Sequence, residues 1–278
     1  MDHGRREGAR GGETAGAADR GFSLIELAVA VVILSLLFGG LLTPLAVQWD
    51  VRQVAETRRI LDDVREALLG YAVAHGHLPC PDRLGDGDGL ADARVDGLDV
   101  PADGCRAGDY EGWVPWATLG VAPGDAWGRR LRYRVSREFT RRAGDPSAVP
   151  CLRATGKNPC TLELGDAGDI AVATRDLQTR TERTLARELP VLVVSLGPNG
   201  LGGVDVAGRP VAPGTPPWDD ERRNLDRDAV FLARDRTPGA PGCQDNSAAA
   251  PLCEFDDLVA WISPHILLGR LVSAGQLP

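Results

Sequence analysis

The sequence predicts an α+β protein in which a long N-terminal helix packs on a β-rich head with long loops. Three observations lead to this prediction. A long uncharged apolar stretch runs directly into a segment whose apolar residues recur at helical spacing. Short β-compatible segments then alternate with stretches rich in Gly, Pro and Asp. The head also contains 6 cysteines, an even number that fits disulfides pinning the loops in an oxidising compartment.

Residues 1–21 differ sharply from the rest of the chain. They are polar and rich in Gly and Ala, with four acidic residues and four arginines among the first 20 residues. A segment of this composition buries too little apolar surface to offset the entropy lost on folding. We therefore expect residues 1–21 to be separate from the folded protein.

Residues 22–47 predict a transmembrane helix. The 21 residues from Leu27 to Val47 carry no charge, and at about 1.5 Å per residue such a helix spans roughly 30 Å of hydrocarbon. The stretch ends in Thr43 and Pro44, whereas a secretory signal would end in a small-residue cleavage site. Glu26 lies near its start, and an acid in an apolar helix indicates a functional residue that needs a partner.

Residues 48–76 predict an amphipathic continuation of the same helix. Apolar residues recur at steps of three or four, with Arg58 interrupting one position of the stripe. The members of this stripe are Val47, Val51, Val54, Leu61, Val64, Leu68 and Tyr71. Gly76 is a suitable terminator because prolines follow it closely. The helix is therefore expected from about 23 to about 75.

Residues 77–278 predict a single head domain. The expected strands are Leu131–Ser136, Thr161–Leu164, Ile170–Thr174, Val191–Leu196 and Val230–Ala233. The strongest of them lies in the fully apolar run PVLVVSLG, which Pro and Gly–Pro bound. The polar segment Asp176–Glu188 favours a helix, and Ser263 with Pro264 has the chemistry that opens a final helix.

The cysteines allow 15 disulfide pairings, because 6 are present. Pairing nearest neighbours is the simplest arrangement and closes three local loops: Cys80 with Cys105, Cys151 with Cys160, and Cys243 with Cys253. A loop of about 15 residues contributes roughly 3 kcal/mol to stability in the chain-entropy model. Free thiols in a cytosolic protein are the alternative.

Charge and motif content exclude two classes of function. The net charge of −8 argues against a nucleic-acid partner, because phosphate contacts require clustered Lys and Arg. Ser195 precedes G-P-N-G, but no G-x-S-x-G motif surrounds it and no His lies nearby in sequence. The sequence therefore predicts a protein that is not an enzyme.

Two acidic loops are weak candidates for calcium. Asp86, Asp88 and Asp92 alternate with glycines in GDGDGLADA, which resembles part of a calcium loop without its terminal Glu. A second loop contains Asp219, Asp226 and Asp228. The alternative for both loops is ordinary Asp/Gly turn chemistry.

The segment G-F-S-L-I-E-L, residues 21–27, resembles the cleavage and methylation signature of type IV prepilins and type II secretion pseudopilins. The resemblance implies that a prepilin peptidase cuts after Gly21 and that Phe22 is then N-methylated. It also implies that Glu26, the fifth mature residue, pairs with the N-terminal amine of a neighbouring subunit. An ammonium and a carboxylate buried together compensate each other, whereas either alone is destabilising.

Four head segments are also similar to secretion-type pilin proteins: LPCPD (78–82), 113–135, VVSLGPNG (193–200) and FDDLVAWIS (255–263). The resemblance implies a pilin-like head and, because major pseudopilins hold calcium in a C-terminal loop, adds support for the second acidic loop. It implies a structural subunit of a pseudopilus or pilus in the bacterial inner membrane. The N-terminus would be cytoplasmic and the head periplasmic, or the subunit would stand in an extracytoplasmic fibre. A non-polymerising single-pass protein with a binding head, and a membrane-anchored hydrolase, are the alternatives.

Overall fold

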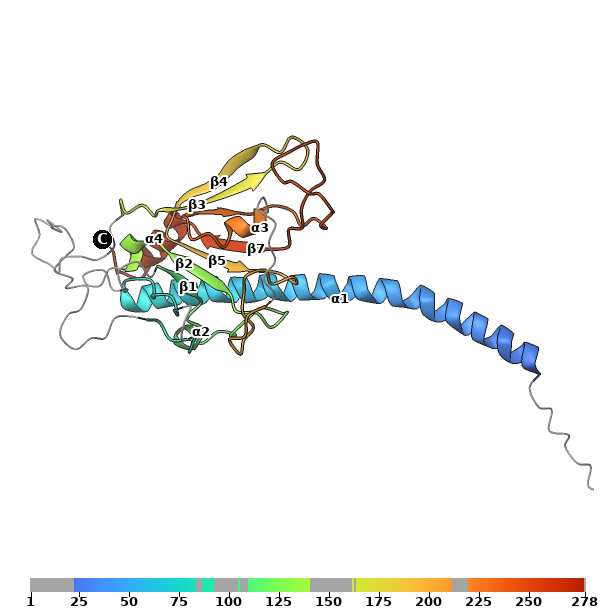
Figure 1. The fold of residues 1–278 in the computed structure, drawn as a ribbon. Coiled ribbons are helices and arrows are strands. Elements are labelled where there is room, and N and C mark those ends of the chain that lie inside the picture. The colour runs from blue at the N-terminus through green and yellow to red at the C-terminus, as the bar shows by residue number, and fades with distance from the viewer. Residues whose placement is uncertain are drawn as a thin grey trace, which may run out of the picture. The chain divides into compact units, whose positions relative to one another are not determined.

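The computed structural model divides the chain into two compact units, Met1–Asp50 and Val51–Pro278. Figure 1 labels most of the helices and strands, and each unit is described by itself below. The residues that the structure describes, without the side chains of 36–47, are 23–83, 87–92, 105, 110–140, 162, 164–211 and 220–277.

Helix α1 spans Leu24–His75, close to the predicted limits. Ser23 caps its start, because the Ser23 Oγ accepts a hydrogen bond from the Glu26 N–H at 3.2 Å. Ser and Glu three residues apart have the spacing of a capping box. At the other end Gly76 adopts a φ of +76°, and its N–H donates to the carbonyl of Ala72 at 2.8 Å. A left-handed residue of this kind ends many helices and favours glycine.

In the second unit, one face of α1 is buried against the head. Leu61, Val64, Leu68 and Ala72 are each at most 3% exposed. Their spacing of three or four residues is the predicted apolar stripe. Arg58 occupies a position on the same stripe but is exposed.

The larger sheet is antiparallel throughout, with strand order β1-β2-β5-β7. Its register places Val193 of β5 between Tyr133 of β2 and Ala260 of β7. The strands are β1 (Glu111–Trp113), β2 (Arg132–Val135), β5 (Val191–Ser195) and β7 (Leu258–Ile262).

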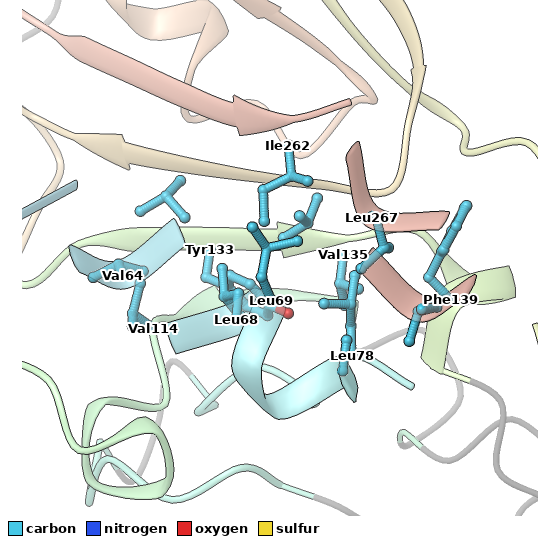
Figure 2. Packing of buried hydrophobic residues seen from close by; sticks show 14 of the residues in the cluster. Val64, Leu68, Leu69, Leu78, Val114, Tyr133, Val135, Phe139, Ile262 and Leu267 are labelled. Atoms are coloured by element: carbon cyan, nitrogen blue, oxygen red, sulfur yellow. The ribbon is translucent and has the colours of Figure 1, made fainter. Parts of the chain in front are cut away.

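Both faces of β5 are covered, which explains its fully apolar sequence. Val191 and Val193 pack into a core with α1 and the C-terminal helix α4 (Pro264–Ser273), part of which Figure 2 shows. Leu192 and Val194 face the opposite way, into a second cluster with the smaller sheet. The larger sheet is therefore a middle layer between a helical layer and another sheet.

The smaller sheet has the order β4-β3-β6, with β3–β4 antiparallel and β3–β6 parallel. Its strands are β3 (Ile170–Arg175), β4 (Glu182–Leu189) and β6 (Val230–Leu232). The helix predicted over Asp176–Glu188 is wrong, because most of that segment is strand β4. Asp176 accepts hydrogen bonds from the N–H groups of Gln178 and Thr179, which closes a tight turn into the strand. β4 is an edge strand that is exposed almost throughout, so its sequence lacks the alternation of apolar and polar residues that predicts a strand.

The remaining elements follow the predictions unevenly. The strands expected near Leu131, Ile170, Val191 and Val230 are confirmed. In the segment Thr161–Leu164, Leu162 and Leu164 are described and lie in no strand, whereas the other two residues lie outside the described residues. Helix α4 is confirmed, with the Ser263 Oγ accepting the Ile266 N–H at 3.3 Å. Strands β1 and β7 were not predicted. The short elements are α2 (Trp116–Leu119), the 3₁₀ helix η1 (Arg137–Thr140) and α3 (Asp220–Arg223).

Two disulfides are present in the described part of the chain. Cys80 is bonded to Cys105 and Cys243 to Cys253, with Cα–Cα distances of 5.4 and 4.9 Å. Both are pairs that the nearest-neighbour arrangement predicts. Cys151 and Cys160 lie outside the described residues.

Candidate processing and assembly site

The start of α1 carries the residues that the sequence singled out. Gly21 and Phe22 lie outside the described residues, and Ser23 is the first that the structure describes. Glu26 lies in the first turn of the helix and is exposed. The Leu27 N–H donates to the Ser23 carbonyl at 3.1 Å, so regular helical hydrogen bonding begins at Ser23.

The position of Glu26 also suits it to stabilise the N-terminus of its own helix. An acid in the first turn interacts favourably with the partial positive charge of the helix N-terminus. As the third helical residue after the cap, it also occupies the position of the capping-box Glu. A test of its charge must consequently separate capping from pairing between subunits.

The side chains on either side of Glu26 are apolar and are exposed around the helix. Leu24 is 88% and Ile25 74% exposed, and the large apolar residues from Leu27 to Leu34 are each about half exposed. A helix that is apolar on all sides is normally buried. This surface therefore requires a covering that the described chain does not supply.

A search of the described residues identifies no helix with the length and apolar character needed to cross a membrane. The predicted membrane segment 22–47 lies partly outside those residues, because Phe22 and the side chains of 36–47 are not described.

In the head, three of the segments singled out by the sequence meet. Asp125 of D-A-W-G accepts a hydrogen bond from the Ser195 Oγ at 2.6 Å. Nearby, the Arg129 guanidinium donates to the Gly197 carbonyl at 2.6 Å. The Asn199 N–H then donates to a carboxylate oxygen of Asp256 at 3.0 Å. The S-L-G-P-N-G loop is thus held between the D-A-W-G turn and the F-D-D segment.

Ser195 is placed as a structural residue. Its side chain is fully buried at the end of β5, and its hydroxyl donates to Asp125. Burial raises the pKa of the Asp125 carboxyl, while the hydrogen bonds from Ser195 and from backbone N–H groups oppose that rise. A substrate has no access to this hydroxyl in the structure.

The acids predicted as calcium candidates accept hydrogen bonds from backbone N–H groups where they are described. Asp88 accepts the Leu90 N–H at 2.8 Å, and Asp228 accepts the Val230 N–H at 2.7 Å. Asp92 and Asp226 likewise accept the N–H groups of Arg83 and Asp228, at 2.8 and 3.2 Å. The other two, Asp86 and Asp219, lie outside the described residues. Turn chemistry accounts for Asp88, Asp226 and Asp228, whose partners lie two residues further on, whereas Asp92 bonds across nine residues to Arg83.

A different set of acids is brought together in the head. In the described part of the chain, Glu221, Asp256 and Asp257 form the one group of three whose ligand atoms lie within 4.8 Å of one another. All three side chains are buried. Gly197 approaches them so closely that a Cβ there would lie 2.1 Å from the Asp256 Oδ1. A side chain at position 197 would therefore disrupt this acid cluster.

Burial changes the proton affinity of the acid cluster. Burial, and next the charge of Asp257, raise the pKa of Glu221 to about 9, while a hydrogen bond from Asn199 opposes the rise. Burial also raises the pKa of Asp256 to about 6. Three carboxylates held this close retain a proton or bind a cation, because like charges disfavour full ionisation.

The acid cluster supplies only oxygen atoms, which are the ligands that calcium and other hard cations take. Glu221, Asp256 and Asp257 are therefore the residues that could hold a metal in the head. The sequence-based prediction favoured the acids around them instead, because acids spaced along one loop resemble a calcium loop. The adjacent pair Asp256–Asp257 next to an apolar run was the available signal.

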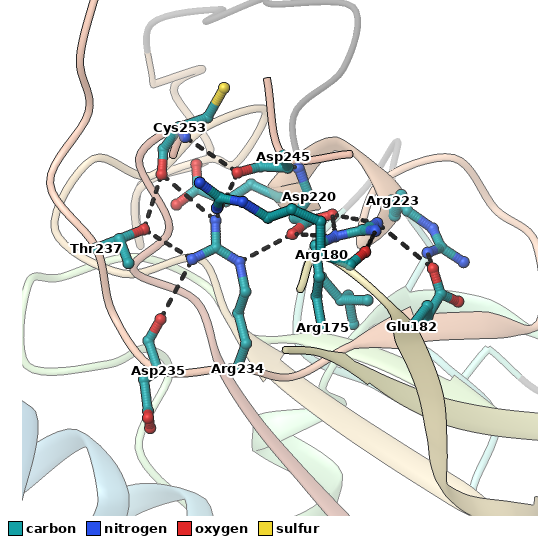
Figure 3. Close-up of polar contacts among 12 residues, drawn as sticks. Arg175, Arg180, Glu182, Asp220, Arg223, Arg234, Asp235, Thr237, Asp245 and Cys253 are labelled. Carbon is teal, nitrogen blue, oxygen red and sulfur yellow. Dashed lines mark hydrogen bonds and ion pairs between the residues drawn. The ribbon is translucent and has the colours of Figure 1, made fainter. Parts of the chain in front are cut away.

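Asp220, next to Glu221, belongs to a separate ion-pair network (Figure 3). Its carboxylate binds Arg175 and Arg234, each with a closest contact of 2.9 Å. Arg234 also binds Asp245 at 3.1 Å, and the Asp245 carboxylate accepts the N–H of Cys253 at 3.0 Å. The loop closed by the Cys243–Cys253 disulfide is thereby fixed to the start of α3.

The comparisons with known proteins concern the N-terminal segment. Residues 17–42 match the model of the prokaryotic N-terminal methylation motif. No curated protein and no solved structure matches the chain significantly. The motif covers Gly21, Phe22 and Glu26, and it implies a processed protein of the type IV pilin or pseudopilin kind.

Proposed function

We propose that this chain, which carries the prokaryotic N-terminal methylation motif at residues 17–42, is a structural subunit of a type II secretion pseudopilus or a type IV pilus. In this proposal a prepilin peptidase cuts after Gly21 and methylates the new N-terminus at Phe22. Mature subunits then associate through the helix that begins there. The motif match is the observation that carries the proposal.

The exposed apolar surface of α1 supports assembly through the helix. From Leu24 to Leu34 the large apolar side chains are each about half exposed or more, counting only cover from the described residues. Lipid of the bacterial inner membrane would cover them before assembly, and the helices of neighbouring subunits would cover them in a fibre. The two disulfides favour a head on the periplasmic side, where thiols are oxidised.

Glu26 would supply the specificity of this association. In a fibre its carboxylate would pair with the N-methylated ammonium of Phe22 in the next subunit. Methylation leaves the positive charge on that amine, so the pair stays ionic. Removing one partner leaves an unpaired buried charge, which destabilises by roughly 3–5 kcal/mol.

Substitution of Glu26 tests the proposal because Gln and Val separate charge from capping. Glu26→Gln removes the charge but keeps a side chain suited to the capping box, whereas Glu26→Val removes both. Both variants should be inserted and cleaved normally, and both should fail to enter fibres. The measurement is a sheared-fibre fraction beside a membrane-fraction blot, in cells without other copies.

A matched control is Ser23→Ala, which weakens the cap but keeps the Glu26 charge. Ser23→Ala should enter fibres while Glu26→Gln does not. Equal incorporation of Glu26→Gln and the unaltered chain would contradict the paired-charge assembly. That result would favour a single-pass protein whose head acts as a binding module.

A further inference from the structure

In the described part of the chain the two sheets of the head have four strand edges, and β7 differs from the other three. The edge of β1 is covered, because Asp82 and Trp113 exchange backbone hydrogen bonds of 3.0 and 2.8 Å. β4 carries charged side chains along its edge, and β6 has three residues. Charge, shortness and covering are the devices that protect edges from pairing with other chains.

Strand β7 has none of these protections from the residues that the structure describes. Its sequence Leu-Val-Ala-Trp-Ile contains neither a charged residue nor a proline. Among the described residues its backbone pairs with β5 alone. Because ladder hydrogen bonds of an antiparallel strand alternate in direction, part of the β7 backbone faces outward. Figure 1 shows β7 beside β5, its partner at this end of the larger sheet.

The open edge borders two cavities. One, of about 520 Å³, lies between α1 and β7 and is lined by residues that include Arg58, Leu61 and Leu258–Trp261. The other, of about 730 Å³, lies toward β3 and β4. Val259 and Trp261 line both. We name the β7 edge with these two cavities the β7 groove.

One charge in the first cavity is available to a ligand. Arg58 is exposed and makes no hydrogen bond or ion pair with the described part of the chain. The neighbouring charges are engaged: Arg65 binds Asp62 at 2.9 Å, and Arg234 is held by Asp220 and Asp245 (Figure 3). Arg58 is also the residue that interrupts the apolar stripe of α1.

We propose that the β7 groove binds an extended segment of another protein, which adds to β7 as a further strand. An acidic side chain of that segment would pair with Arg58, and apolar side chains would pack on Val259 and Trp261. In such complexes backbone hydrogen bonds provide affinity, and pockets beside the strand select alternate side chains. The proposal holds whether or not the chain assembles into fibres.

A second copy of this chain is a poorer occupant. Each described strand is already paired on at least one side, so a copy could offer only an edge strand, and its β7 has no acidic residue to pair with Arg58. Pairing of β4 with β7 across two copies would place the charged side chains of β4, Glu182 and Arg183 among them, along an apolar edge. Such charges oppose edge-to-edge association.

The test uses the mature full-length chain in detergent micelles. The probe is a fluorescein-labelled synthetic peptide of alternating valine and threonine with an aspartate at its end. Binding is followed by anisotropy, and hydrogen exchange measures protection of the backbone N–H groups in β7. The matched control peptide has the same sequence with alternate amides N-methylated, which removes its ladder hydrogen bonds.

The probe should bind and should slow exchange at residues 258–262, and the N-methylated peptide should do neither. Arg58→Glu should raise the Kd by roughly three- to tenfold, as expected for reversing one exposed charge pair. Arg59→Glu, exposed on the same helix but outside both cavities, should leave the Kd unchanged.

Three results would overturn the proposal. Equal binding of both peptides would exclude strand addition, and equal effects of Arg58→Glu and Arg59→Glu would exclude a specific carboxylate contact. Protection of residues 258–262 that depends on protein concentration and needs no peptide would assign the groove to a second copy. Thermal melts of both arginine variants would establish that they fold alike.

Discussion

The two ends of α1 differ in how their apolar residues are covered. Near the start of the helix, Ile25 and Val31 are 74% and 53% exposed. In the second unit, Val64 and Leu68 of the same helix have no exposed surface. The sequences of the two segments explain the difference, because the first is apolar on all sides and the second on one face.

This contrast separates folding from assembly. The second segment finds its packing partners within the chain, in the core shared with β5, β7 and α4. The first segment has no such partner among the described residues. Substitutions in the second segment should therefore alter the stability of the head, and those in the first should alter association instead.

The largest effect is expected from Leu68→Ala. Removing a fully buried leucine leaves a cavity and should lower the free energy of unfolding by about 2–5 kcal/mol. Val31→Ala should leave the unfolding of the head unchanged. Denaturant titration followed by tryptophan fluorescence measures both, and equal destabilisation by the two variants would contradict the separation.

An intermediate effect is expected at the acid cluster. Its pH dependence shows whether protonation or a bound cation stabilises the three buried carboxylates. The pKa of Glu221 is raised from 4.5 to about 9, and that of Asp256 from 3.8 to about 6. A carboxyl whose pKa is higher in the folded than in the unfolded chain stabilises the fold. This contribution is complete below the unfolded-state pKa and is lost as the pH rises through the folded-state pKa. In EDTA the Tm should therefore fall from pH 5 to pH 9, by roughly 5 °C or more.

Glu221→Gln should flatten this pH dependence, because glutamine does not ionise. Asp176→Asn is the matched control, since Asp176 is exposed in the β3–β4 turn and hydrogen bonds from the N–H groups of Thr179 and Gln178 lower its pKa. Added calcium should raise the Tm at pH 9 if the acid cluster takes a cation. A Tm that rises from pH 5 to pH 9 in EDTA would contradict the raised pKa values of the acid cluster.

The smallest effect is expected from Ser23→Ala at the cap of α1. Loss of an N-cap side chain destabilises a helix end by about 1 kcal/mol. The first turn should then exchange its N–H groups faster, while β5 in the head keeps its protection. Faster hydrogen exchange in β5 as well would mean that the stability of the head depends on the first turn of α1.

The sequence predicted those elements whose pattern is set by burial. The stripe from Leu61 to Leu68 and the apolar run of β5 were predicted because each is packed in a regular way. Strand β4 was mistaken for a helix because an exposed edge has no alternation of apolar and polar residues. The acid cluster joins Glu221 to Asp256 and Asp257, which are distant in sequence, and only the folded chain brings them together.

Intact-mass and peptide-fragment mass spectrometry of the chain purified from its membrane fraction tests the central claim most directly. The account predicts a mature N-terminus at Phe22 that carries one methyl group on its amine. Substituting Gly21 by a bulky residue should leave the uncut precursor in the same fraction. A native N-terminus at Met1, or one beyond Thr43, would contradict the account.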